Sequence, residues 1–156
     1  KGVNMTESTI MYFAYGSNMD SNRLYDRIGD FSSSERAHLS GFQFQYNKLS
    51  YTLNQVYANI TPELNSMVWG ALIEIDESQL EKLDESEGVG NGHYRHEKVM
   101  VVTDQNIEIE ALTYVSEEKW VKDGLKPKEK YRNFCIRGAN EFNLPQEYVN
   151  QVLKVT

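Results

Sequence analysis

One acidic residue stands where a helix-like segment gives way to a glycine-rich loop. Glu87 ends the acidic run Glu81, Asp84, Glu85 and Glu87, and Gly88-Val89-Gly90-Asn91-Gly92 follows at once. A dinucleotide-binding fingerprint leaves a strand and opens a helix, whereas here a predicted helix leads into the loop and a predicted strand leaves it. The glycines instead provide a flexible backbone that a ligand can approach closely. Most acidic runs are solvated helix faces, so the run by itself does not single out Glu87 as a catalyst.

A second segment, Tyr12 to Met19, combines aromatic residues with a turn. Its sequence, Tyr-Phe-Ala-Tyr-Gly-Ser-Asn-Met, is typical of a strand that stops at Gly16-Ser17-Asn18. Backbone N–H groups at such a stop have no strand partner. If a helix begins near Asp20, these groups and the helix dipole form a cradle for an anion such as a carboxylate. A plain strand-to-helix turn is the alternative that the pattern leaves open.

Metal and thiol chemistry find little support in the sequence. The three histidines are His38, His93 and His96, and the last two would point to opposite faces of a predicted strand. Because no metal-binding spacing is present, we expect surface histidines and no metal site. The single cysteine, Cys135, falls on the apolar side of a predicted helix, which favours a buried structural thiol over a nucleophile.

The composition restricts the class of protein. The 156 residues are 40% hydrophobic, and 23 acidic against 16 basic side chains give a net charge of −7. A chain this acidic is a poor partner for nucleic acid, and its longest apolar run, residues 67–73, is about a third of a membrane span. We therefore expect neither nucleic acid nor membrane as a partner. A lone cysteine and the lack of a signal-like N-terminus favour the cytoplasm.

The elements that must position these residues form one domain. No repeat or linker divides the chain, so we expect a domain over residues 10–156 and an N-terminal extension or expression remnant over residues 1–9. Residues 32–36 read as a surface loop. Strand patterns cover residues 10–15, 42–46, 56–60, 67–75, 94–103 and 107–115, the last two as a hairpin.

Helices are fewer and come late in the chain. Asp76 and Gln79 form a plausible capping box for a short helix that ends near Glu85. A longer helix is expected over residues 128–142, and Pro145 is suited to the first position of a last helix. Strands and helices do not alternate as βαβ units. We therefore predict an α+β fold: a single compact domain with a mostly antiparallel or mixed β-barrel of five to six strands, flanked by a few helices.

The two chemical segments belong to one ordered pattern, which resembles the γ-glutamylcyclotransferase family. Its motifs, in chain order, are Tyr12–Met19, Val68-Trp69-Gly70, Leu83-Asp84-x-x-Glu87-Gly88, Gly92-His93-Tyr94, Tyr131, and Gly138-Ala139-x-x-x-x-Leu144-Pro145-x-x-Tyr148. Any one motif is weak evidence. The ordered set spans Tyr12 to Leu153, nearly the whole chain, and raises Glu87 from one acidic residue among many to the leading catalytic candidate.

The resemblance implies an enzyme, a transferase or lyase of glutathione metabolism, that converts γ-glutamyl amino acids into 5-oxoproline and a free amino acid without cofactor or metal. Glu87 would act as general base and then as general acid. The partner would be a small γ-glutamyl substrate, and a homodimer through the late tyrosine-rich helices is left open. The substrate-binding residues would be Tyr12, Ala14, Tyr15, Gly16, Ser17, Asn18, Tyr94 and Tyr131.

The residue types suit this reaction independently. The α-amino nitrogen of a γ-glutamyl compound can close a five-membered ring on its own γ-carbonyl, so the enzyme mainly orients the substrate and moves protons. One glutamate can take a proton from the amine and return it to the departing group. Work near neutral pH favours a Glu87 pKa above the usual value of about 4.3, which requires partial burial. Backbone N–H groups of Gly16-Ser17-Asn18 and tyrosine hydroxyls are candidate donors to the substrate.

Two departures from the family pattern bear on substrate choice. Lys128 stands before Tyr131 where family members commonly have a small polar residue after proline, and His93 places an imidazole where an apolar side chain is expected. Either change could alter the pocket and the amino acid that leaves. Two alternatives therefore stay open: a cyclotransferase for γ-glutamylamines, and a non-catalytic module that binds a small carboxylate on the same fold.

Overall fold

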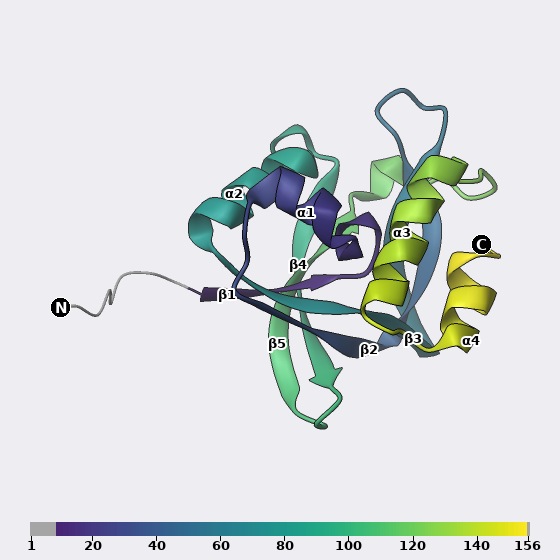
Figure 1. Ribbon diagram of the computed structural model, residues 1–156. Helices are drawn as coiled ribbons and strands as arrows, with labels where there is room; N and C mark the ends of the chain where they lie inside the picture. The colour runs from purple at the N-terminus through teal and green to yellow at the C-terminus, as the bar shows by residue number, and fades with distance from the viewer. Residues whose placement is uncertain (1–8, 156) are drawn as a thin grey trace.

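The fold is a closed five-stranded β-barrel. The computed structural model describes residues 9–155. The strands are β1 (Thr9–Ala14), β2 (Ser33–Leu49), β3 (Val56–Asp76), β4 (Tyr94–Thr103) and β5 (Glu108–Ser116), and they close in the order β1-β3-β2-β4-β5 (Figure 1). Four of the pairings are antiparallel, and β1 meets β5 in parallel at Tyr12 and Leu112. The predicted α+β barrel is confirmed, and it is mixed.

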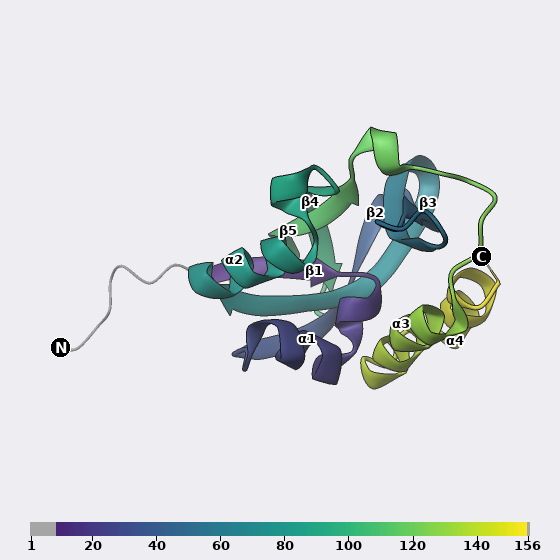
Figure 2. The ribbon, with the colours of Figure 1, turned by 90° about the horizontal axis from the view of Figure 1, so that it is seen from above.

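The helices cover two regions of the barrel. Helix α1 (Ser21–Ile28) lies near α2 (Glu77–Ser86), whereas α3 (Glu129–Glu141), α4 (Gln146–Tyr148) and the following helical turn Val149–Leu153 lie together elsewhere on the barrel surface (Figures 1 and 2). Short helical turns occupy Ser17–Met19, Val89–Asn91 and Glu118–Trp120. Among the described residues, no helix is long and apolar enough to cross a membrane.

Two predictions about β2 and β3 are wrong. Residues 33–36, expected in a surface loop, begin β2, and the two predicted strands 56–60 and 67–75 are parts of one long β3. Both differences result from long-range pairing. Strands β2 and β3 form one antiparallel ladder that extends from the pair Ser33 and Glu74 to the pair Leu49 and Val56. Pro62, within β3, is exposed and pairs with Phe42 where the register shifts. A proline is tolerated at such an irregularity.

The predicted helices are close to those observed. The Asp76–Gln79 capping box forms with both of its hydrogen bonds, and α2 ends at Ser86. Pro145 precedes the last helix and is not its first residue. The predicted extension over residues 1–9 lies outside the described residues except for Thr9, which begins β1.

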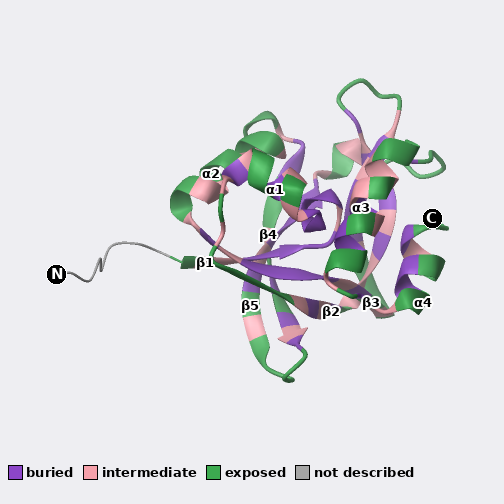
Figure 3. Ribbon diagram, viewed as in Figure 1, coloured by how far each residue is buried: buried purple, intermediate pink, exposed green. Residues whose placement is uncertain are grey.

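Helix α3 packs against the turn that follows β1. Buried residues lie along the barrel strands and on parts of α3 and α4, where the ribbon of Figure 3 is purple. Cys135 is fully buried on α3, which confirms the structural thiol, and burial raises its pKa to about 12. Gly138 allows the closest approach, since a Cβ there would lie 2.4 Å from the carbonyl carbon of Met19. The helix thereby supports the backbone of the turn from behind.

Candidate active site

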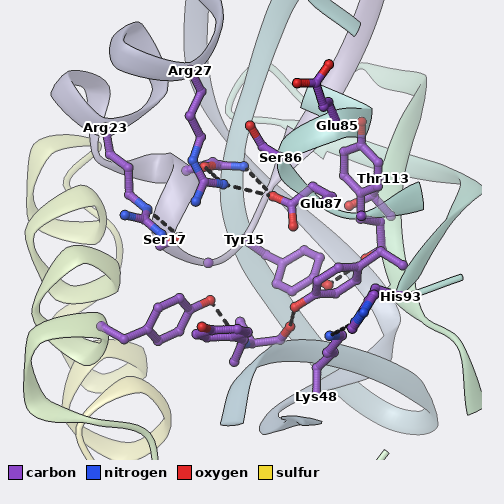
Figure 4. A pocket seen from close by; sticks show the side chains of 18 of the residues that line it. Tyr15, Ser17, Arg23, Arg27, Lys48, Glu85, Ser86, Glu87, His93 and Thr113 are labelled. Atoms are coloured by element: carbon purple, nitrogen blue, oxygen red, sulfur yellow. Dashed lines mark hydrogen bonds and ion pairs between the residues drawn. The ribbon is translucent and has the colours of Figure 1, made fainter. Parts of the chain in front are cut away.

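A cavity of about 360 Å³ lies beside the turn after β1, the end of α2 and the start of β4. Figure 4 shows side chains from these separate segments converging on it. Of the nine predicted site residues, eight line the cavity: Tyr12, Tyr15, Gly16, Ser17, Asn18, Glu87, Tyr94 and Tyr131. Ala14 does not; its side chain is buried in the barrel.

Glu87 is held in the cavity wall by two donors on one oxygen. It caps the C-terminus of α2, where its N–H donates to Leu83 O at 2.9 Å. Asn18 Nδ2 and Arg27 Nη1 donate to Glu87 Oε1 at 2.9 and 3.2 Å. Within the described part of the chain, Oε2 has no hydrogen-bond partner, and the side chain points into the cavity (Figure 4). The hydrogen bonds to Oε1 therefore fix the orientation of the carboxyl group, and Oε2 stays accessible to a molecule in the cavity.

The environment of Glu87 favours proton transfer. The side chain is 15% exposed, and this burial raises the pKa of Glu87 above its ordinary value of 4.5. Arg27 and the Asn18 hydrogen bond act in the opposite direction and limit the rise. A carboxyl group whose pKa moves toward neutrality can exchange a proton more readily at working pH. The run that ends at Glu87 thus combines exposed Glu81 and Glu85 with one enclosed carboxylate.

The turn before α1 has the geometry that the sequence suggested. Asp20 caps α1 by accepting from Arg23 N at 3.0 Å, and Arg137 Nε donates to its other oxygen at 2.7 Å. Ser17–Met19 form a helical turn, whose first N–H groups have no acceptor within the turn. Because these amides border the cavity, an anion cradle at Gly16-Ser17-Asn18 stays a prediction that the geometry permits.

The tyrosines form much of the wall, but two of them cannot donate to a substrate as expected. The hydroxyl groups of Tyr15 and Tyr94 donate to Tyr114 O at 2.5 Å and to Ala58 O at 2.7 Å. Burial raises the pKa of both, so they stay protonated and fixed. Tyr12 differs, because its oxygen accepts from Asn18 at 3.0 Å and its own proton is available.

Several cavity residues escaped the sequence analysis. Arg23 and Arg27 lie four residues apart on α1, and Arg23 Nε donates to Ser17 Oγ at 3.0 Å. The predicted helix start near Asp20 was a signal that could have found them, since residues at i and i+4 share a helix face. Lys48 had no such signal. Tyr46, Asn47 and Lys48 are all buried because a bulge interrupts the alternation of β2.

The histidine prediction is wrong for His93. Its exposed fraction is 6%, and its Nδ1 lies 2.6 Å from Lys48 Nζ at the edge of the cavity. His96 is exposed, as expected, and its Nε2 lies 2.6 Å from Asp84 Oδ1. In the described residues, no group of His, Cys, Asp or Glu is arranged to hold a metal ion. Lys128 is exposed and is not part of the cavity lining.

Aromatic walls and one oriented carboxyl group of raised pKa characterise the cavity. Small-molecule sites combine a pocket with a few convergent polar groups, and a perturbed carboxyl group there is a candidate for acid–base chemistry. The fold and the cavity are those of an enzyme that acts on a small molecule.

The comparisons with known proteins specify the family. Residues 67–152 match the model of the AIG2-like family. The chain is 32% identical to the gamma-glutamylcyclotransferase of Homo sapiens over 146 residues, which cover 91% of this chain and 76% of that protein. The corresponding protein of Mus musculus is 31% identical over 144 residues, 90% of this chain and 75% of its own length. The chain belongs to this AIG2-like, γ-glutamylcyclotransferase family.

The fold agrees with this assignment. A solved structure described as a gamma-glutamyl cyclotransferase superimposes with a TM-score of 0.79 at 30% sequence identity, covering 95% of this chain and 88% of the other. The predicted resemblance is therefore confirmed.

Proposed function

We propose that this protein is a γ-glutamylcyclotransferase in which Glu87 transfers the protons. The α-amino nitrogen of the substrate attacks its own γ-carbonyl carbon, and a C–N bond forms that closes the five-membered ring. The γ-amide C–N bond breaks. The proton that leaves the attacking nitrogen passes to Glu87 and then to the departing nitrogen, so the products are 5-oxoproline and a free amino acid.

The observation that carries the proposal is Glu87 Oε2, which has no hydrogen-bond partner among the residues that the structure describes. Arg27 and Asn18 hold Oε1, which leaves Oε2 to face a bound substrate. A carboxylate fixed in this way can reach the attacking and the departing nitrogen in turn, because both are bonded to atoms of the same small ring in the tetrahedral intermediate. The raised pKa of Glu87 supports both roles, since the group then gives up and takes back a proton near neutral pH.

The turn after β1 is proposed to hold the glutamyl part of the substrate. Its backbone amides and the adjacent Arg23 guanidinium, 3.0 Å from Ser17 Oγ, provide positive partners for an α-carboxylate. Tyr12 contributes a hydroxyl proton from the same side. The rings of Tyr15, Tyr94 and Tyr131 enclose the reacting atoms and keep water away from them.

Release of 5-oxoproline from γ-glutamyl-alanine, followed by chromatography, tests the proposal. We expect turnover by the unchanged protein, and Glu87→Gln should lower it by at least about 10²-fold, the usual contribution of a general acid–base group. Glu81→Gln is the matched control, because Glu81 is an exposed carboxylate of the same helix. If Glu87→Gln keeps most of the rate, Glu87 is not the proton-transfer group.

Other parts of the proposal concern the surroundings of the reaction. The reaction is redox-neutral and its nucleophile belongs to the substrate, so the proposal includes no metal and no cofactor. A cytoplasmic location is supported by the single buried cysteine. The homodimer stays a prediction: Tyr131 lines the cavity and Tyr148 is buried, so these tyrosines are already used within the chain. Light scattering on the purified protein would measure its oligomeric state.

A further inference from the structure

Lys48 is a buried cation that makes no ion-pair contact with a carboxylate of the described residues. Its exposed fraction is 3%, yet no carboxylate of the described residues lies within 4.0 Å of its Nζ. Charged side chains are rarely buried unless they are paired, because loss of hydration costs several kcal/mol. Lys48 lines the cavity, so its partner can come from a bound molecule.

The amine of Lys48 is fixed on its other sides. Nζ donates to Leu49 O at 2.8 Å and lies 2.6 Å from His93 Nδ1. The rings of Tyr94 and Trp120 have their centroids 5.3 and 5.1 Å from Nζ. An ammonium group has three N–H donors, and these contacts use two of them. Burial lowers the pKa of Lys48 to about 8, which still leaves the group mostly protonated at neutral pH.

His93 holds Lys48 in place. To accept from the lysine, Nδ1 must be unprotonated, which places the ring proton on Nε2. Stacking fixes the ring, with Trp120 at 4.2 Å and Tyr51 at 5.3 Å between centroids. The Lys48 amine is thereby fixed, and its remaining N–H is a charged donor for one oxygen of a carboxylate.

The position of this pair in the cavity indicates which carboxylate it would bind. Figure 4 shows Arg23 and Arg27 on one side of the cavity and Lys48 and His93 on the other, with Glu87 nearer the middle. The proposed function places the α-carboxylate at the turn beside Arg23 and the bond that breaks at Glu87. The part of the substrate that leaves must then extend toward Lys48.

We propose that Lys48, held in place by His93, binds the carboxylate of the departing amino acid. This inference rests on the proposed function and assigns the residue that selects its substrate. γ-Glutamyl amino acids and peptides carry a carboxylate beyond the γ-amide, whereas γ-glutamylamines do not. Lys48 is a specificity-determining residue in this scheme, His93 positions it, and neither takes part in proton transfer.

Two substrates that differ only in this carboxylate test the inference. Release of 5-oxoproline is measured with γ-glutamyl-alanine and with γ-glutamyl-ethylamide. Lys48→Met, which removes the charge and keeps an extended side chain, should lower kcat/KM for γ-glutamyl-alanine about 10- to 100-fold through KM, the range for a charged hydrogen bond. The rate with γ-glutamyl-ethylamide, measured at a pH above the acid limb set by Glu87, should change less than about 2-fold, since this substrate has no carboxylate for Lys48 to bind.

The control and a second variant separate binding from folding. Lys119→Met removes an exposed lysine that lies 5.8 Å from the same Trp120 ring but does not line the cavity, and neither rate should change. His93→Phe keeps a ring between Tyr51 and Trp120 and removes the acceptor that positions Lys48. It should lower only the rate with γ-glutamyl-alanine. Equal losses on both substrates, or no loss on either, would overturn the inference.

A binding measurement distinguishes failure of this inference from failure of the proposed function. Calorimetric titration of the Glu87→Gln protein with the two compounds measures affinity without turnover. We expect tighter binding of γ-glutamyl-alanine and loss of the difference in the double variant with Lys48→Met. If the unchanged protein forms no 5-oxoproline but this difference is found, the proposed function fails and the carboxylate site stands. Equal affinities refute the site whether or not turnover occurs.

Discussion

At the scale of single residues, the cavity is lined by two ionisable side chains, Glu87 and Lys48, whose pKa values burial shifts toward neutral pH. Burial raises the pKa of Glu87 and lowers that of Lys48 to about 8. The two differ in their partners, because Glu87 is paired with Arg27 and Lys48 has no carboxylate within 4.0 Å among the described residues. Arg27 therefore orients the carboxylate of Glu87, whereas the ammonium group of Lys48 is suited to binding an anion.

The pH dependence of the reaction tests the electrostatics of Glu87. The base form is the carboxylate, so kcat/KM should fall as pH drops through the pKa of Glu87, and this acid limb should lie above pH 4.5. Arg27 is the main group that lowers this pKa; Arg23, Lys48 and Asn18 act in the same direction. Arg27→Met should therefore raise the pKa further and move the limb to higher pH.

The pH profile of kcat/KM with γ-glutamyl-alanine measures this movement. Arg36→Met is the control, because Arg36 pairs with Asp104 on the surface and should leave the limb in place. A limb that stays fixed in Arg27→Met would mean that a group other than Glu87 controls the acid side of the profile.

At the scale of elements, three irregularities place the site. The turn after β1 stops a strand and caps α1 at Asp20, the bulge in β2 turns Lys48 inward, and α2 ends just before its C-cap residue, Glu87. Regular elements would leave these side chains in alternation or on a helix face. Bulges and helix ends redirect single side chains, which is why functional groups gather there.

Close packing of α3 behind the turn should be necessary for its shape. In Gly138→Ala the new Cβ would meet the backbone of Met19 and Asp20 at 2.4 and 2.5 Å, and neither atom belongs to a flexible side chain. We expect a loss of about 1–3 kcal/mol of unfolding free energy, the usual cost of overpacking, with reduced turnover from the displaced turn. Urea denaturation and the 5-oxoproline assay measure the two effects. Asn140→Ala, an exposed change on the same helix, should leave both within error.

At the scale of the whole molecule, barrel closure brings the two halves of the site together. Strand β1 carries the turn and Tyr12, and it meets β5 through one ladder pair, Tyr12 with Leu112. Two buried hydrogen bonds reinforce this contact: Thr113 Oγ1 donates to Phe13 O at 2.7 Å, and Tyr15 donates to Tyr114 O. The seam between β1 and β5 therefore depends on side chains more than on backbone pairing.

Thr113→Val should weaken this seam. The substitution keeps the volume and leaves Phe13 O without its buried donor, so we expect a loss of about 1–3 kcal/mol in unfolding free energy by chemical denaturation. Thr61→Val, whose hydroxyl makes a 3.4 Å hydrogen bond in the partly buried part of β3, is the control and should cost less. Equal losses of unfolding free energy in the two variants would show that the Thr113–Phe13 hydrogen bond stabilises the protein no more than the Thr61 hydrogen bond does.

Much of the fold was predictable because local patterns carry it. The alternation of residues 107–115, the capping box at Asp76 and the apolar face of α3 each depend on neighbours within a few residues. The length of β2 and β3 was not predictable, since Ser33–Arg36 lack a strand pattern and Pro62 argues for a break. Their strand conformation comes from pairing with segments far along the chain.

The sequence by itself predicted the two segments that border the candidate site. The turn at Gly16-Ser17-Asn18 was predicted from residue types, because local backbone chemistry defines a turn. Glu87 was singled out by the ordered motifs that resemble the γ-glutamylcyclotransferase family. Only the tertiary structure decided that Arg27 orients Glu87 and that Lys48 meets His93. Residues 60 and 45 positions apart become partners only when the barrel closes, and burial of a charge depends on what packs around it.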